Sequence, residues 1–155
     1  MAVDKVIVTN VSALQGKYGP RYADVKAAIR ALIDADKGRG LKTVLVAIDS
    51  AVDMKRAGGT PVKKAGDERA VKAAVDAVCK VHTPDYILIL GAPDVVPHVL
   101  LSNPMRHADG GDDDPNVPSD VPYACDAAFS RNPKDFVGPT RVVGRLPDVM
   151  GAKEP

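Results

Sequence analysis

The 155-residue chain has the composition of one soluble globular domain: 45% of its residues are hydrophobic, 26% are charged, and the formal net charge is +1. No basic block occurs, so the charge pattern of a nucleic-acid-binding protein is absent. The apolar runs, such as YILILG, are far shorter than the roughly 20 residues of a membrane span.

The N-terminus, MAVDKVIVTN, lacks the charged and then apolar layout of a signal peptide. Together with a count of only two cysteines, this predicts a cytoplasmic protein with free thiols. A secreted protein whose leader had been removed would begin in the same way, so that alternative stays open.

The first half of the chain alternates strand patterns with helix patterns. Residues 5–9, KVIVT, form a β-branched run that predicts a buried strand. After a Gly/Pro loop, apolar residues recur at helical spacing from Tyr22 to Ile33, and Gly38 and Gly40 predict the end of this helix. Residues 43–48 predict a second strand.

Residues 51–66 are polar and contain several glycines, which predicts a loop. Asp67 is placed to cap a second helix whose apolar stripe runs from Val71 to Val78. Residues 86–90, YILIL, predict a third strand. The order β-α-β-loop-α-β over residues 1–91 indicates a parallel sheet with right-handed crossovers, which is an α/β fold.

The remaining residues differ in character, although we expect them to belong to the same single subdomain. Residues 92–139 are rich in proline and aspartate and show no helical period, which indicates a functional loop region. Residues 140–148 predict a final strand over 141–143, followed by a turn at Gly144 and Arg145. Residues 149–155 form a tail.

Two groups of residues could carry chemistry on their own. Cys125 could be a nucleophile with His98 as its base, but the acids beside Cys125 would raise the thiol pKa, and a structural cysteine is the preferred interpretation. The segment DGGDDDPN offers four carboxylates that suit calcium, with a solvated acidic loop as the preferred alternative: Asp109, Asp112, Asp113 and Asp114. No glycine-rich loop follows the first strand, so a phosphate cradle is not predicted.

Three segments resemble the gingipain-type cysteine peptidases of the caspase-like clan. The segment PDYILILGAPDVVPH is similar to a strand of that family that runs into "vP". PSDVPYACD resembles its "sD-x-x-Y" element, and TRVVGRLPD resembles its "vGRlp" element. The matching residues of these last two elements include Ser119, Asp120, Tyr123, Gly144, Arg145 and Pro147.

The resemblance implies a caspase-like three-layer sandwich, a mostly parallel sheet flanked by helices, that is incomplete in this chain. It also implies peptide-bond hydrolysis by a His–Cys dyad. No "HG" element occurs, and Cys125 precedes the "GRLP" strand, so no catalytic residue is carried over. We therefore expect an N-terminal, non-catalytic subdomain that has an apolar edge and face, needs no cofactor, and pairs with a C-terminal catalytic subdomain.

Two other interpretations stay open. The chain could be a stand-alone caspase-like scaffold or interaction domain, with no catalysis of its own. It could instead be an unrelated Rossmann-like binding domain or small enzyme that uses Cys125 with His98. All three interpretations exclude nucleic acid and membranes as partners, and the first adds a peptide or protein substrate for the intact enzyme.

Overall fold

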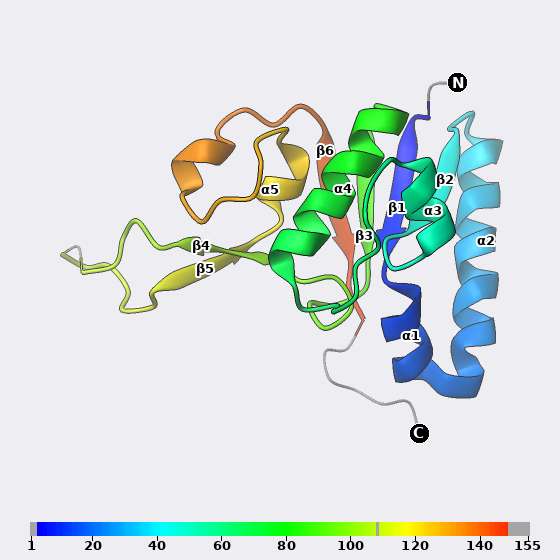
Figure 1. The fold of residues 1–155 in the computed structure, drawn as a ribbon, viewed down its shortest axis with the longest axis horizontal. Coiled ribbons are helices and arrows are strands. Elements are labelled where there is room, and N and C mark those ends of the chain that lie inside the picture. Colours follow the sequence, from blue (N-terminus) through cyan, green and yellow to red (C-terminus); the bar gives the residue numbers. More distant parts are fainter. Residues whose placement is uncertain (1–2, 108, 149–155) are drawn as a thin grey trace.

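A computed structural model describes residues 3–107 and 109–148 and shows an α/β fold (Figure 1). Its centre is a parallel sheet with the strand order β2-β1-β3-β6. The four strands are β1 (Lys5–Thr9), β2 (Thr43–Ala47), β3 (Tyr86–Leu90) and β6 (Val142–Leu146). The parallel sheet and its first three strands were predicted from the sequence, and the structure confirms them.

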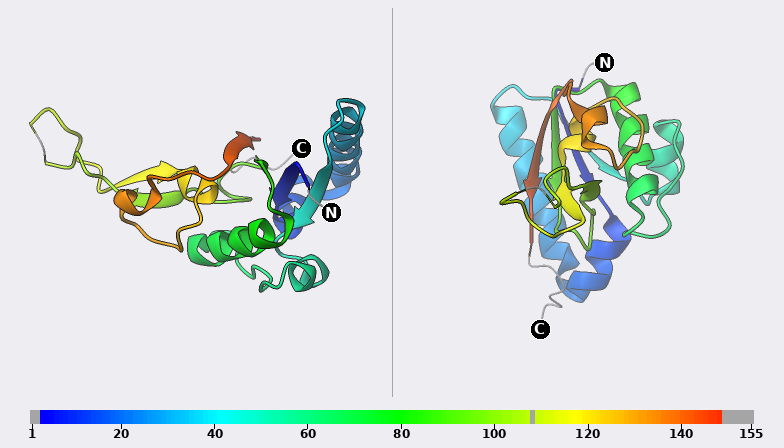
Figure 2. Two further views of the ribbon diagram at one scale, coloured as in Figure 1. Left: turned by 90° about the horizontal axis from the view of Figure 1, so that it is seen from above. Right: turned by 90° about the vertical axis from the view of Figure 1, so that its left-hand side faces the viewer.

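Helices cover the sheet on both sides, so the fold is compatible with a three-layer sandwich (Figure 2). Helix α2 (Tyr22–Gly38) lies on one face, and α3 (Ala51–Arg56) and α4 (Glu68–His82) lie on the other. The shorter helical segments are α1 (Val11–Tyr18), η1 (Gly19–Arg21), α5 (Val121–Ala124) and η2 (Pro133–Phe136). Within the described ranges, no helix has the length and apolarity needed to cross a membrane.

The prediction of helices α2 and α4 is confirmed, but α1 and α3 were missed. Asn10 ends β1 and also caps α1, since its side chain accepts a hydrogen bond from the amide of Ala13. Ser50 caps α3 in the same way, through the amide of Asp53, so residues 51–56 are not loop. Both helices are short, and a short helix shows too few turns for a periodic apolar pattern.

The predicted turn at Gly144 and Arg145 is wrong, because both residues lie inside β6. Gly144 is in register with Leu88 of β3, and Arg145 with Ile89. A Gly–Arg pair favours a turn when only local sequence is considered. Here the strand continues because its backbone pairs with β3 from Val142 to Leu146, and tertiary partners satisfy the guanidinium group of Arg145.

The main hydrophobic core fills the space between the sheet and α4. It combines β-branched residues from the strands with the apolar stripe of α4, and these members are at most 2% exposed: Val6, Val8, Ile87, Ile89, Val71, Val75 and Val78. Cys79 and Cys125 belong to the same cluster, and both are free thiols. The near-continuous apolar character of the strands follows from burial of a parallel sheet.

Residues 92–139, predicted as a loop region, contain a two-stranded antiparallel arm that projects from the body (Figure 1). It consists of β4 (Val99–Ser102) and β5 (Asn116–Ser119), with Leu101 opposite Val117. The alternating pattern was hidden because the strands have only four residues each and β5 contains Pro118. The predicted tail, 149–155, lies outside the described residues.

Candidate functional site

The loop that follows β3 lies at the carboxyl ends of the strands, where open α/β sheets bind their ligands. It begins at Gly91, whose φ of +116° favours glycine. A Cβ atom at this position would also lie 2.6 Å from Cβ of Val95, so the tight turn requires a glycine. The carbonyl of Gly91 is thereby directed toward Arg145 on the neighbouring strand.

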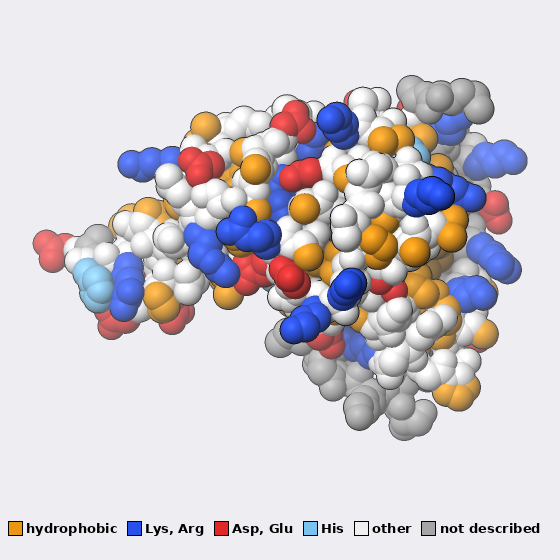
Figure 3. Space-filling model, in the orientation of Figure 1, with side chains coloured by type: hydrophobic (Ala, Val, Ile, Leu, Met, Phe, Trp, Pro, Cys, Tyr) orange, Lys and Arg blue, Asp and Glu red, His pale blue; other side chains and the backbone are white. Residues whose placement is uncertain are grey.

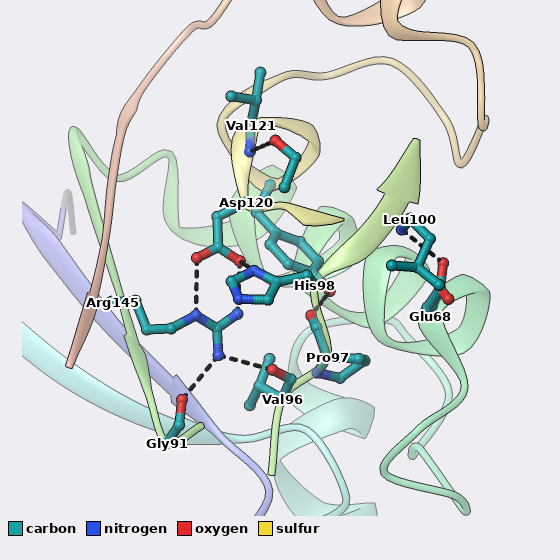
Figure 4. Close-up of polar contacts among 11 residues, drawn as sticks. Glu68, Gly91, Val96, Pro97, His98, Leu100, Asp120, Val121 and Arg145 are labelled. Carbon is teal, nitrogen blue, oxygen red and sulfur yellow. Dashed lines mark hydrogen bonds and ion pairs between the residues drawn. The ribbon is translucent and has the colours of Figure 1, made fainter. Parts of the chain in front are cut away.

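Arg145 joins three segments of the chain through one side chain (Figure 4). Its Nη1 donates to the carbonyls of Gly91 and Val96, each at 2.8 Å. Its Nε donates to Oδ2 of Asp120 at 2.8 Å, and its Nη2 donates to Oδ1 of the same carboxylate. Because the side chain is only 9% exposed, this two-point ion pair is shielded from solvent. The contact brings the PSDVPY and GRLP segments together.

His98 is the more exposed member of the same cluster. Its Nδ1 lies 3.0 Å from Oδ1 of Asp120, and its side chain is 28% exposed. An ionised carboxylate can only accept a hydrogen bond, so the hydrogen of a neutral His98 ring lies on Nδ1. The Asp120 carboxylate therefore sets the orientation of the imidazole.

Tyr123 supports the cluster from within the protein. Its hydroxyl donates to the carbonyl of Pro97 at 2.7 Å, and its side chain is fully buried. Burial raises the pKa of Tyr123, and the nearby negative charge of Asp120 raises it further. The hydroxyl therefore stays protonated and can donate a hydrogen bond. Ser119 accepts a hydrogen bond from the amide of Val121 and shapes the start of α5. The side chains of Asp120 and Tyr123 thus hold different partners, and the two residues are joined through the backbone, where the amide of Tyr123 donates to the carbonyl of Asp120 at 3.0 Å.

A second network, which sequence reasoning missed, holds the other side of the same loop. Asp148 accepts from the amide of Ala92 at 2.7 Å and from the hydroxyl of Tyr18 at 2.7 Å. Lys17 bridges Asp148 and Asp94. No local signal could find this network, because α1 and the end of β6 are about 130 positions apart and meet only in the folded sheet. Pro147, between β6 and Asp148, lines an adjoining apolar groove.

The charges of this second network reinforce each other. Burial alone would raise the pKa of Asp148, but hydrogen bonds from Lys17, Tyr18 and Ala92 outweigh it and lower that pKa. Burial would lower the pKa of Lys17, yet its bonds to Asp148 and Asp94 raise it. Both groups are therefore ionised at neutral pH. The loop after β3 is fixed on one side by Asp148 and on the other by Arg145.

The N-terminus of α1 is closed by protein groups. Asp49 at the end of β2 accepts hydrogen bonds from the amides of Val11 and Ser12, each at 2.8 Å. The helix that Asp49 caps precedes it by 38 positions in the chain. These amides are the groups that would face a phosphate in a nucleotide-binding fold, and here a carboxylate already occupies them.

The structure does not bring Cys125 and His98 together as a reacting pair. Cys125 is 2% exposed, and its carbonyl accepts a hydrogen bond from the buried Lys72 at 3.2 Å. Lys72 also pairs with Asp76. The ring of His98 is hydrogen-bonded to Asp120 instead. Cys125 thus lies in the packed core near α4, and His98 lies at the carboxyl ends of the strands.

A large cavity, about 570 Å³, lies at the opposite end of the sheet, beside the residues that precede β3 and β6. Three of its charged wall residues are engaged with protein groups, because Arg141 contacts Asp126 and Asp76 contacts Lys72; Lys80 and Asp85 also line it. Cys79 also lines it, and burial raises the pKa of this thiol to about 11, which leaves it unreactive at neutral pH. We therefore place the candidate site at the carboxyl ends rather than at this cavity.

The four aspartates considered for calcium lie at the outer end of the arm, where acidic side chains are visible in Figure 3. Asp109, Asp112, Asp113 and Asp114 are all exposed. Within residues 3–107 and 109–148, no group of three metal-ligating side chains is arranged to hold an ion. Calcium binding by these residues stays a prediction.

The carboxyl-end cluster is thus a rigid wall built from ion pairs and carbonyl contacts. The guanidinium of Arg145 and the carboxylate of Asp120 are fully engaged with protein groups, which suits positioning rather than proton transfer. Comparison with known protein families, curated proteins and solved structures found no significant match. The family resemblance therefore depends on the motif residues alone.

Proposed function

We propose that this chain is the N-terminal, non-catalytic subdomain of a gingipain-like cysteine endopeptidase with a caspase-like sandwich. The fold is compatible with this reading, because a parallel sheet is flanked by helices on both faces. The peptide-bond hydrolysis itself would be carried out by a His–Cys dyad located C-terminal to this chain. The partner of the chain is then the catalytic subdomain of the same protein, and the substrate is a peptide or protein.

The observation that carries the proposal is the ion pair between Asp120 and Arg145. The two residues belong to the two motifs that resemble the family, and they are 25 positions apart. Their contact lies at the carboxyl ends of β3 and β6, where a substrate site of an open α/β sheet is expected. A chance resemblance of two unrelated segments gives no reason for their side chains to pair in a shielded site.

The proposed division of labour assigns all covalent chemistry to the second subdomain. There a cysteine thiolate attacks the peptide carbonyl, a histidine moves the proton, and backbone amides hold the oxyanion. The present chain supplies the sheet and a fixed loop wall beside the substrate. No cofactor is required by this proposal, and calcium at the acidic end of the arm is an optional addition.

The test is to read the coding sequence downstream of Pro155 and to assay the longer protein for thiol-dependent endopeptidase activity. We expect an "HG" element and a later cysteine, each after a further strand pattern, and activity that is lost when this cysteine is replaced by alanine. Arg145→Lys should lower the activity, whereas Arg30→Lys, an exposed change on α2, should leave it unchanged. A downstream sequence without these two elements would refute the proposal.

The second candidate function is a stand-alone scaffold or interaction domain. The projecting arm favours it, because Leu100 and Val117 remain 37% and 41% exposed on a two-stranded ribbon. This candidate predicts that the 155-residue chain is monodisperse and unfolds cooperatively by itself. Aggregation that is relieved by co-expression of the downstream sequence would instead support the peptidase subdomain.

A further inference from the structure

The imidazole of His98 has a fixed position in the wall at the carboxyl ends of the strands. The carbonyl of Pro97, directly before it, accepts a hydrogen bond from the buried hydroxyl of Tyr123. Val99, directly after it, is fully buried and begins strand β4. The ring itself bonds through Nδ1 to Asp120, at 3.0 Å (Figure 4). The protein itself therefore fixes both the backbone and the side chain of His98.

The second ring nitrogen of His98, Nε2, is the polar atom of this cluster that the protein leaves unused. In the part of the chain that the structure describes, Nε2 has no hydrogen-bond partner. No buried side-chain nitrogen or oxygen atom of the described residues lacks a partner, so Nε2 is in contact with solvent. The side chain of His98 is 28% exposed, whereas that of Arg145 is 9% exposed. A ligand at the wall can therefore reach Nε2.

Asp120 decides which kind of ligand group Nε2 can bind. An ionised carboxylate only accepts hydrogen bonds, so the hydrogen of the neutral ring lies on Nδ1 and Nε2 carries a lone pair. The guanidinium of Arg145 bonds to the same carboxylate oxygen, Oδ1, and balances its charge. The wall thus presents a neutral, oriented hydrogen-bond acceptor, and a matching ligand has to bring an N–H or O–H group.

Two other roles of an oriented histidine fit these surroundings less well. Carboxylates also orient histidines that ligate metals, but within residues 3–107 and 109–148 no three metal-ligating side chains are arranged to hold an ion. A histidine that activates a cysteine has to lie against the thiol, and Cys125 lies in the packed core instead. The geometry therefore favours recognition of a hydrogen-bond donor.

We propose that His98 is a substrate-binding residue whose Nε2 accepts a hydrogen bond from a backbone N–H of the peptide substrate, and this inference rests on the proposed function. A peptide presents one such donor at every residue except proline, whatever its side chains. His98 lies at the carboxyl ends of the strands, where open α/β sheets bind their ligands. Because the ring is already fixed, binding costs little side-chain entropy. All bond breaking stays with the catalytic subdomain.

Nitrogen NMR of the 155-residue chain tests the state of the ring without any assumption about activity. At a pH where the imidazoles are neutral, His98 should carry its hydrogen on Nδ1. The exposed His107 should instead show the mixture of both tautomers that is found for an unconstrained imidazole. A hydrogen on Nε2 of His98 would overturn the inference, because that nitrogen could then only donate.

Peptide substrates in which an ester oxygen replaces one backbone N–H test the contact itself in the longer protein. Each such peptide lacks a single donor at a position away from the cleaved bond. For the wild type, the ester at the contacted position should raise KM roughly fivefold with kcat nearly unchanged, as expected when a uniform binding interaction is lost. His98→Asn keeps an amide that can donate to Asp120 but has no atom at the place of Nε2. This variant should have the higher KM with the normal peptide and should not respond to that ester.

His107→Asn is the matched control, because His107 is exposed and its φ of +61° is one that asparagine tolerates. It should respond to every ester as the wild type does. Peptide hydrolysis with the same response by the wild type and His98→Asn at every position would overturn the role of His98 and leave the proposed function standing. If the longer protein hydrolysed no peptide, the proposed function would be refuted, and the substrate contact with it.

Discussion

Replacement of Arg145 by methionine should destabilise the protein strongly, since this side chain links β6, the loop after β3 and the start of α5. Methionine keeps much of the aliphatic volume but removes every donor. The carboxylate of Asp120, 17% exposed, would keep His98 as its remaining partner, and the carbonyls of Gly91 and Val96 would lose their donor. The perturbation therefore leaves acceptors in a poorly solvated site.

The expected magnitude follows from the burial of both partners. Removal of one member of a shielded ion pair costs about 3 to 5 kcal/mol, because the other charge stays behind without compensation. The two carbonyl contacts are part of the same loss and are not added to it, since contacts that share one side chain are not independent. We expect a decrease of about 3 to 5 kcal/mol in the free energy of unfolding, and about half of that for Arg145→Lys, which keeps a charge but loses the two-point contact.

Urea denaturation followed by circular dichroism measures this free energy, with the slope checked for two-state behaviour. The control is Arg30→Met on the exposed side of α2, which should change stability by no more than about 0.5 kcal/mol. A double-mutant cycle with Asp120→Asn isolates the ion pair, and we expect a coupling energy of about 2 kcal/mol. A loss below about 1 kcal/mol for Arg145→Met, or no coupling in the cycle, would refute the structural role of this network.

Three further predictions concern stability. Tyr123→Phe should cost about 1 to 2 kcal/mol in urea unfolding, because the carbonyl of Pro97 loses a buried donor; no loss would contradict that bond. Lys72→Ala should lower the free energy of unfolding by about 3 kcal/mol or more, because Lys72 is fully buried against Asp76. Lys72→Met should lower it clearly less, because methionine fills most of the same volume. Equal losses would contradict this packing argument. The pKa of Asp148 is lowered in the folded protein, so its ionised carboxylate adds stability at pH values above the unfolded pKa of about 4, and this stability is lost as the pH falls through the folded pKa. Asp148→Asn should therefore lose less stability than the wild type between neutral pH and about pH 3. An unchanged pH profile would argue against the contact.

Local sequence patterns were sufficient for the elements that build the main core. The runs at residues 5–9 and 86–90 are apolar throughout, and such runs remain strands once both faces of a parallel sheet are covered. The stripe from Val71 to Val78 repeats at helical spacing, and Asp67 caps the helix as expected. In each case the local preference and the tertiary environment agree, and patterns of this kind are the ones that sequence reasoning predicts well.

Two of the elements that the sequence did not predict correctly, α1 and β6, also have partners that are distant in sequence. The start of helix α1 is held by the local cap Asn10 and by Asp49, 38 positions later, which accepts its first amide hydrogen. Strand β6 runs through Gly144 and Arg145 because its backbone pairs with β3, which lies more than 50 positions earlier in the chain. Neither interaction leaves a trace in the local pattern, so the local turn preference was misleading at β6.

The sequence by itself determined the α/β class, the first three strands and their parallel arrangement, and the two motifs at residues 119–123 and 143–147. Only the tertiary structure decided what those motifs do, since it placed Asp120 against Arg145 and His98 and buried Cys125 away from them. The physical reason is that the two kinds of interaction act over different separations along the sequence. Burial of apolar area acts through periodic patterns that one segment displays by itself, whereas an ion pair requires two particular side chains whose meeting is set by the strand order of the whole sheet.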